Sequence, residues 1–215
     1  SKILIIKIIQ KEVGNMESVA KIIKNLQDGN YPSMPNMVRI KIPDAEKRLR
    51  GGLDFMVARF SGGRITKAIW SESNYRPIVD WMADNEGKGL LMTGSCGLGK
   101  SLIGIRILPC LINQVHHKIL NCCDAKDMNY KADELLNYHL LSLDDVGNEG
   151  MANNYGNKRM VFPELVDEAE KKGRLLVIST NLNIPELQQK YGDRTIDRLR
   201  AITKFVPFTG KSLRG

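Results

Sequence analysis

GSCGLGKS, residues 94–101, combines three glycines with a lysine and a serine, directly after the apolar run at 90–92. Glycine reaches positive φ and lets a ligand approach the backbone closely. The spacing matches G-x-x-x-x-G-K-[ST], in which backbone N–H groups surround phosphate oxygens at the start of a helix. A glycine-rich turn with a chance lysine is the alternative, which the position between an apolar strand and a helical stretch disfavours. The pattern therefore predicts a phosphate-binding loop.

The two side chains after the last glycine have separate tasks in this pattern. We expect Lys100 to reach the β- and γ-phosphates and the Ser101 hydroxyl to bind Mg²⁺. The predicted nucleotide-binding segment consists of Gly94, Ser95, Cys96, Gly97, Leu98, Gly99, Lys100, Ser101 and Leu102.

A second candidate site lies in HLLSLDDVG, residues 139–147, an apolar strand that ends in two acids. A carboxylate at such a strand tip can hold the water shell of Mg²⁺, and a second can orient or deprotonate an attacking water. We expect Asp144 to serve the metal and Asp145 to be catalytic, the alternative being an acidic surface turn. A third strand, in GRLLVISTNLNIPEL at 173–187, ends at Thr180 and Asn181. Asn181 would hold the attacking water if this strand lies between the other two.

The order of elements predicts an α/β fold. Apolar strands at 90–93, 118–122, 139–144, 174–179 and 203–208 alternate with helices from 101 and at 124–137, 158–171, 184–190 and 193–199. This alternation is typical of a parallel sheet with its site at the carboxyl ends of the strands. Pro109 is expected to kink or end the helix after the loop.

The part of the chain before residue 90 is less regular. An apolar stripe predicts a helix at 16–27, residues 31–63 are interpreted as a linker with short helices, 65–70 as a strand and 75–89 as a helix ending in a turn.

Composition and charge restrict the class of protein. The chain of 215 residues has a net charge of +8 and no uninterrupted apolar stretch long enough to cross a bilayer, so we expect a cytoplasmic protein. Its four cysteines have neither C-x-x-C spacing nor the pattern of a disulfide framework. The basic excess is compatible with nucleic acid and equally with a solvated surface.

Five motifs together carry a family resemblance: GLLMTGSCGLGKS, LLSLDDVG, VISTNL, GDRTIDRLR and GKSLR. Over roughly residues 75–214 the chain resembles AAA+ ATPases, and within them the DnaC-type bacterial and phage replicative helicase loaders and the IstB-type transposition helpers. The resemblance implies a P-loop NTPase of the AAA+ type, a three-layer sandwich with a central parallel sheet. Together with the less regular pattern before residue 75, it divides the chain into three expected regions: an N-terminal helical extension at 1–30, a linker and N-terminal part of the ATPase module at 31–74, and the ATPase core at 75–215.

The same resemblance implies roles for individual residues. Gly94 to Ser101 correspond to the Walker A loop, Asp144 and Asp145 to the Walker B pair, and Asn181 to sensor I. Arg198 corresponds to an arginine finger that reaches a neighbouring subunit's nucleotide, with Arg194 as second choice, and Arg214 to the sensor II arginine. An arginine supplied in trans would make hydrolysis depend on assembly.

Three departures from the family pattern limit what is carried over. Many AAA+ proteins have Glu where this chain has Asp145. The stretch between Cys123 and His139 leaves little room for the helical insertion with which DnaC-like loaders bind single-stranded DNA, and no cysteine cluster precedes the core.

We therefore expect an oligomerising ATPase with ATP or ADP and Mg²⁺ as ligands and a replicative helicase, or DNA, as partner. A transposase helper and a nucleotide-gated binding protein with little hydrolysis remain alternatives. A small-molecule kinase is disfavoured because no lid segment with clustered arginines follows the core. Residues from Ile65 to Tyr75 are the expected place for an adenine pocket.

Overall fold

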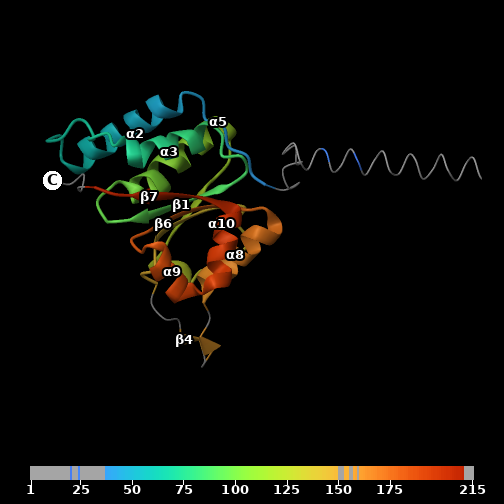
Figure 1. The fold of residues 1–215 in the computed structure, drawn as a ribbon. Coiled ribbons are helices and arrows are strands. Elements are labelled where there is room, and N and C mark those ends of the chain that lie inside the picture. Colours follow the sequence, from blue (N-terminus) through green and yellow to red (C-terminus); the bar gives the residue numbers. More distant parts are fainter. Residues whose placement is uncertain are drawn as a thin grey trace, which may run out of the picture. The chain divides into compact units, whose positions relative to one another are not determined.

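The computed structural model describes Ala20, Lys24 and residues 37–149, 153–154, 157–158 and 160–210 (Figure 1). The chain divides into two units, Ser1–Pro35 and Asn36–Gly215. In the first unit, Ala20 and Lys24 are helical and exposed, and the rest of the helix predicted at 16–27 lies outside the described residues.

The second unit is built on a five-stranded sheet in which every neighbouring pair is parallel. In sheet order the strands are β2 (Asn121–Asp124), β3 (Leu140–Val146), β6 (Leu175–Thr180), β1 (Gly89–Gly94) and β7 (Thr203–Phe208). The third motif strand thus lies between the first two, as the sequence interpretation required. A two-stranded antiparallel hairpin, β4 (Asn153–Asn154) with β5 (Asn157–Lys158), was not expected from the sequence.

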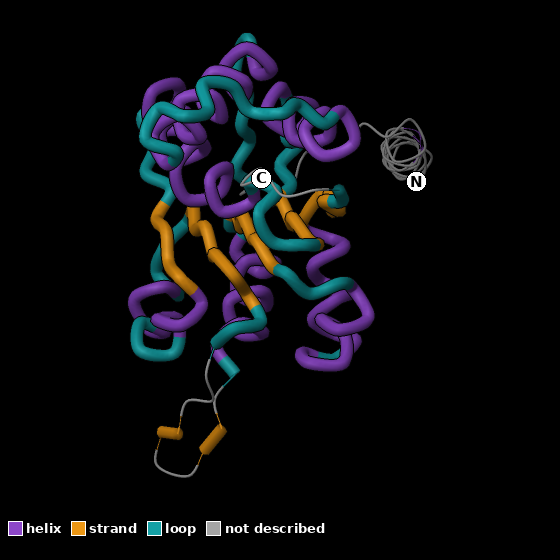
Figure 2. The backbone as a smooth tube through the Cα atoms, turned by 90° about the vertical axis from the view of Figure 1, so that its left-hand side faces the viewer, coloured by secondary structure: helices purple, strands orange, loops and turns teal. Residues whose placement is uncertain are grey.

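Helices cover both faces of the sheet (Figures 1 and 2). One face carries α2 (Ala45–Phe60), α3 (Glu72–Ala83) and α5 (Leu108–His116), and the other carries α8 (Val161–Lys172), α9 (Ile184–Tyr191) and α10 (Asp193–Ile202). The predicted three-layer α/β fold with a central parallel sheet is confirmed.

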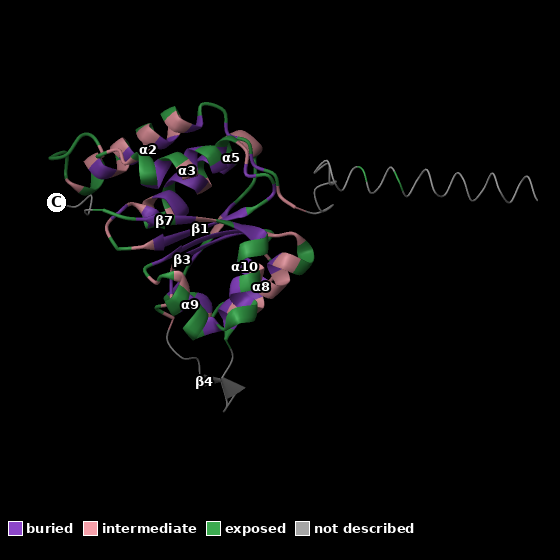
Figure 3. Ribbon diagram, in the orientation of Figure 1, coloured by how far each residue is buried: buried purple, intermediate pink, exposed green. Residues whose placement is uncertain are grey.

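Side chains of each central strand alternate between two apolar cores. Leu90 and Met92 belong to the core under α2, α3 and α5, whereas Leu91 belongs to the core under α8, α9 and α10. Because both faces are covered, the strands are buried almost throughout, and their sequences are continuous apolar runs (Figure 3).

The region interpreted as a linker contains a 16-residue helix, α2. Its buried residues Ala45, Leu49, Leu53 and Val57 recur every fourth position and form one apolar face. Gly52 allows this helix to pack closely, because a Cβ there would lie 3.0 Å from Cγ2 of Ile107. The two adjacent glycines suggested a break, but packing outweighs their low helix propensity.

The strand predicted at 65–70 is wrong: this segment is irregular. Its backbone bonds to side chains of α2 and the following turn instead of to another strand, since Ala68 N–H donates to Asp54 Oδ1 at 2.8 Å and Ile65 N–H to Ser61 Oγ at 2.9 Å. Trp70 packs against α2, with the Arg50 guanidinium 3.6 Å from its ring centroid.

Pro109 neither ends nor interrupts the helical stretch after the loop. The chain is helical from α4 (Lys100–Leu102) through a π-helical turn, η1 (Ile103–Ile107), into α5. Leu108 N–H bonds to the carbonyl of Ile103, five residues back, so the wider turn lies directly before the residue that has no N–H to donate. The expectation of an early end was therefore wrong, because α5 continues to His116.

The connection between β2 and β3 also differs from the prediction. Two short helices, α6 (Ala125–Met128) and α7 (Ala132–Leu135), replace the single helix expected at 124–137. Asp124 caps the first of them by accepting from Lys126 N–H. No helix among the described residues is both long and apolar enough to span a membrane.

Candidate nucleotide site

The loop between β1 and α4 has the backbone that its glycines permit. Gly94, Gly97 and Gly99 have φ values of 106°, 81° and 87°, a region that L side chains rarely adopt. Gly94 has a further reason to be glycine, because a Cβ there would lie 2.2 Å from the carbonyl oxygen of Phe208 on the adjacent strand. The strand–loop–helix unit predicted from the sequence is confirmed.

Lys100 is directed into this loop and is only 5% exposed. Its ammonium donates to the carbonyls of Gly94 at 2.6 Å and Ser95 at 2.7 Å, and to Asn181 Oδ1 at 3.2 Å. Burial lowers the pKa of Lys100, and the nearby Cys96, Asp145 and Asp144 oppose that shift. The ammonium of Lys100 is therefore held among backbone carbonyls and the Asn181 side chain, near the acids at the end of β3.

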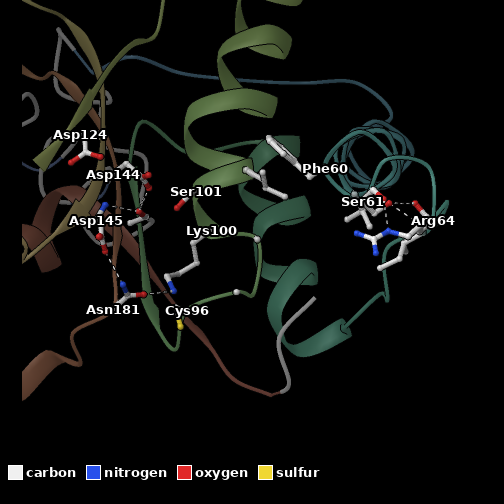
Figure 4. Close-up of a pocket in the computed structure, with 16 residues that line it drawn as sticks. Phe60, Ser61, Arg64, Cys96, Lys100, Ser101, Asp124, Asp144, Asp145 and Asn181 are labelled. Atoms are coloured by element: carbon white, nitrogen blue, oxygen red, sulfur yellow. Dashed lines mark hydrogen bonds between the residues drawn. The ribbon is translucent and has the colours of Figure 1, made fainter. Parts of the chain in front are cut away.

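The two acids at the end of β3 lie beside this lysine (Figure 4). Asn181, at the end of β6, joins the two groups, because its amide donates to Asp145 Oδ1 at 2.7 Å while its oxygen accepts from Lys100. The Asn148 amide donates to the other oxygen of Asp145. The three motifs singled out in the sequence therefore meet at one place.

A cavity of about 830 Å³ runs past these groups, a volume suited to a small-molecule ligand. Acids lie at one end and the loop forms the middle, while the other end is formed by the C-terminal part of α2 and the turn after it (Figure 4). That far end is lined by Val57, Phe60, Ser61, Arg64 and Ile65.

Several lining residues were not singled out in the sequence. Asp124 ends β2 before a helix, and this strand-tip position is the same sequence signal that marks Asp144. The wall formed by α2 has no such signal, because its approach to the loop is a tertiary contact. Of the stretch from Ile65 to Tyr75, expected to hold adenine, Ile65 lines the cavity, whereas the Tyr75 hydroxyl donates to the carbonyl of Leu98 at 3.3 Å and supports the loop. Burial raises the pKa of Tyr75 to about 12.

The residues present fit a nucleotide with Mg²⁺. The Ser101 hydroxyl and the Asp144 carboxylate both line the cavity. Mg²⁺ prefers oxygen ligands and is commonly held by one or two carboxylates together with phosphate oxygens and water. Within the part of the chain that the structure describes, no cluster of three or more His, Cys, Asp or Glu side chains is arranged to hold a metal ion alone. This donor set therefore suits a metal that arrives with phosphates.

Two of the three arginines predicted to act on nucleotide, Arg194 and Arg198, lie on α10. Arg198 is 19% exposed in its side chain and pairs with Asp167 and, at 2.9 Å, with Glu170 of α8. Arg194 is 81% exposed, and its nearest carboxylate contact is Asp167 at 4.0 Å. Neither is among the described residues that line the cavity. Arg214 lies outside the described residues.

Solved structures with a similar fold include the DnaC helicase loader, with 15% identity, a TM-score of 0.48, and coverage of 79% of this chain and 93% of that one. DnaI has 21% sequence identity and a TM-score of 0.43, and the match covers 59% of this chain and 73% of DnaI. AMPPCP-bound DnaA from Aquifex aeolicus has 16% sequence identity and a TM-score of 0.49, and the match covers 68% of this chain and 50% of that one. This chain therefore spans half the length of DnaA. No protein-family model and no curated protein sequence matches the chain.

Proposed function

We propose that the protein is an AAA+ ATPase of the helicase-loader type, which binds ATP with Mg²⁺, hydrolyses the β–γ bond, and uses nucleotide state to control binding of a replicative helicase or DNA. The observation that carries the proposal is the chain of contacts from Lys100 through Asn181 to Asp145 along one cavity. It joins a cation for phosphate, an amide and a carboxylate, which are the groups that hydrolysis of a triphosphate uses.

Each group has a proposed task. Lys100 binds the β- and γ-phosphates, and the loop amides surround them. Ser101 and Asp144 hold the metal, which when bound neutralises charge on the phosphate oxygens. Asp145 and Asn181 orient the attacking water, and Asp145 accepts its proton. Val57, Phe60 and Ile65 form an apolar wall for the base and sugar, with Arg64 and Ser61 beside it.

The exposed charge on α10 supports an assembly-dependent reaction. Arg198, the arginine finger implied by the resemblance, would have to leave Asp167 and Glu170 to reach a neighbouring subunit. Arg194 is free to do so from its exposed position and is a second candidate for the same role. We propose that the active form is a homo-oligomer in which one of these two arginines completes the site of the next subunit, with Arg214 acting within its own.

A nucleotide-gated binding protein with little hydrolysis is a second candidate. It is favoured by one observation: both carboxylate oxygens of Asp145 already accept hydrogen bonds, from Asn181 and Asn148. These two amides compete with the attacking water for the lone pairs of the carboxylate. Partner identity, whether helicase or transposase, is independent of this choice.

Nucleotide binding and turnover separate these possibilities. Binding is measured with a fluorescent ATP analogue, with and without Mg²⁺, and turnover at increasing protein concentration with and without single-stranded DNA. We expect wild-type protein to bind and to turn over ATP more per chain at higher concentration. Asp145→Asn should bind equally well and lose at least about 100-fold in turnover, while the exposed control Asp127→Asn behaves as wild type.

Two results would change the conclusion. Binding with turnover no faster than that of Asp145→Asn would favour the nucleotide-gated binding protein. Absence of nucleotide binding by the wild-type protein would refute both.

A further inference from the structure

The pairing of β3 with β6 is irregular where the two acids lie. Leu143 is opposite Ile178 and Val146 is opposite Thr180, so two residues of β3, Asp144 and Asp145, lie opposite the single residue between them on β6. This extra residue is a β-bulge, and such bulges redirect side chains near functional sites. Asp145 has a φ of 57°, a left-handed conformation in which Asp is tolerated better than most residues.

Ser179 is the residue opposite the bulge, and its hydroxyl joins the two acids. It accepts from the backbone N–H of Asp145 at 3.0 Å and donates to Oδ1 of Asp144. The backbone N–H of Asp145 can only donate, so it occupies a lone pair of the serine oxygen and leaves the serine O–H available for the carboxylate of Asp144. With 3% exposure, Ser179 has little water to replace either bond. One hydroxyl therefore fixes the backbone of one acid and the carboxylate of the other.

The next two residues act on the same strand end in different ways. The hydroxyl of Thr180, the last residue of β6, donates to the carbonyl of Val146 at 2.5 Å, and Asn181, directly after β6, holds the carboxylate of Asp145. Three consecutive side chains at the end of β6 thus secure the irregular end of β3. Of these, Ser179 contacts both acids.

We propose that Ser179 is a positioning residue that sets the directions of Asp144 and Asp145 through the bulge, an inference that rests on the nucleotide function proposed above. Without the hydroxyl, the Asp145 N–H loses this partner, and the Asp144 carboxylate loses the hydrogen bond that orients it in the cavity it shares with Ser101. Partners that orient metal-binding side chains typically contribute 10- to 100-fold in metal affinity or activity, which sets the expected size of the effect.

Three variants test this inference. Ser179→Ala removes the hydroxyl, and Ser179→Thr retains it with one added methyl group. Ser142→Ala is the matched control, because Ser142 is an equally buried serine on β3 whose hydroxyl donates to the carbonyl of Gly104 at 2.9 Å, away from the acids. The principal readout is the Mg²⁺ concentration that gives half-maximal binding of a fluorescent ATP analogue, with binding in the absence of Mg²⁺ and kcat against KM as further measurements.

We expect Ser179→Ala to require about 10- to 100-fold more Mg²⁺ and to bind nucleotide without Mg²⁺ within about twofold of wild type. Its kcat should fall more than its KM rises. Ser179→Thr and Ser142→Ala should remain within about threefold of wild type in every measurement. If the added methyl group lowers the melting temperature of Ser179→Thr, Ser179→Cys is used in place of that variant. Its weak S–H donor should give a Mg²⁺ requirement between those of the wild-type protein and Ser179→Ala.

A wild-type Mg²⁺ requirement in Ser179→Ala overturns the inference while leaving the proposed function standing. The same weakening in Ser142→Ala also overturns it, because the effect would then reflect loss of any buried hydroxyl. If the wild-type protein binds no nucleotide, the proposed function fails and the inference fails with it.

Discussion

Replacing Lys100 with Met tests the predicted phosphate site most directly. Met retains most of the length and the apolar stem of the side chain but removes the ammonium. In the structure that ammonium is held at the mouth of the loop by carbonyl oxygens 2.6 and 2.7 Å away, so its charge has a defined position relative to any ligand there.

The magnitude follows from this position. Two unit charges about 4 Å apart interact by about 4 kcal/mol at an effective dielectric constant of about 20. We therefore expect Lys100→Met to lose about 3–4 kcal/mol of the free energy of ATP binding. That loss weakens Kd by about 100- to 700-fold. At an ATP concentration of about 100 times the wild-type Kd, ligand binding stabilises the wild-type protein by about 2.7 kcal/mol and the variant by less than about 0.5 kcal/mol.

Thermal unfolding with and without Mg²⁺ and ATP measures this difference. For a chain of this length 1 kcal/mol shifts Tm by about 2–4 °C, so the wild-type shift is about 5–11 °C and that of Lys100→Met below about 2 °C. The variant should fold without ligand, since burial lowers the pKa of Lys100 and loss of the buried charge offsets its lost hydrogen bonds. Lys204→Met, at an exposed position of β7, is the control.

A Lys100→Met variant that keeps the full ATP-induced shift would refute the reasoning, because the phosphates would then bind elsewhere. A shift lost equally in Lys204→Met would also refute it, by showing that net charge rather than the loop is responsible.

Three further outcomes are expected. Asn85→Ala should lower the free energy of unfolding by about 3–5 kcal/mol in denaturant titrations, because this buried amide makes four hydrogen bonds to backbone groups; a loss under about 1 kcal/mol would contradict this. Arg198→Ala should lower ATP turnover at least about tenfold and also lower Tm by unpairing acids on α8, whereas Arg194→Ala should leave both near wild type; a tenfold loss of turnover in Arg194→Ala with wild-type turnover in Arg198→Ala would identify Arg194 as the trans arginine. The free energy of unfolding should fall as pH rises from about 10 to about 12, because folded Tyr75 keeps a proton that the unfolded chain has lost; Tyr75→Phe should make this fall shallower, and an unchanged slope would exclude Tyr75 as a cause.

The strand–loop–helix unit around Lys100 was predictable because its determinants are local. Glycines at fixed spacing permit the positive φ values, and the apolar run before them defines a buried strand. The acids at 144 and 145 and Asn181 were found by the same reasoning, since each ends an apolar strand, and parallel strands bring their carboxyl ends to one edge.

The errors lie where tertiary contacts override local preference. The segment at 65–70 has strand-like composition but bonds to α2 and its turn, and α2 itself forms across two glycines because Gly52 packs on Ile107. Pro109 is accommodated by a π-helical turn that no local rule specified. In the first two cases contacts between segments, and not local propensity, decided the structure.

By itself, the sequence determined that an α/β sheet presents a glycine loop, paired acids and an asparagine at its carboxyl edge, since spacing and apolar runs encode these features locally. Tertiary structure alone decided that α2 closes the far end of the cavity, that Arg198 is bound to α8, and that a bulge puts Ser179 between the two acids. These arrangements depend on contacts between segments distant in the chain, whose energies no single stretch of sequence contains.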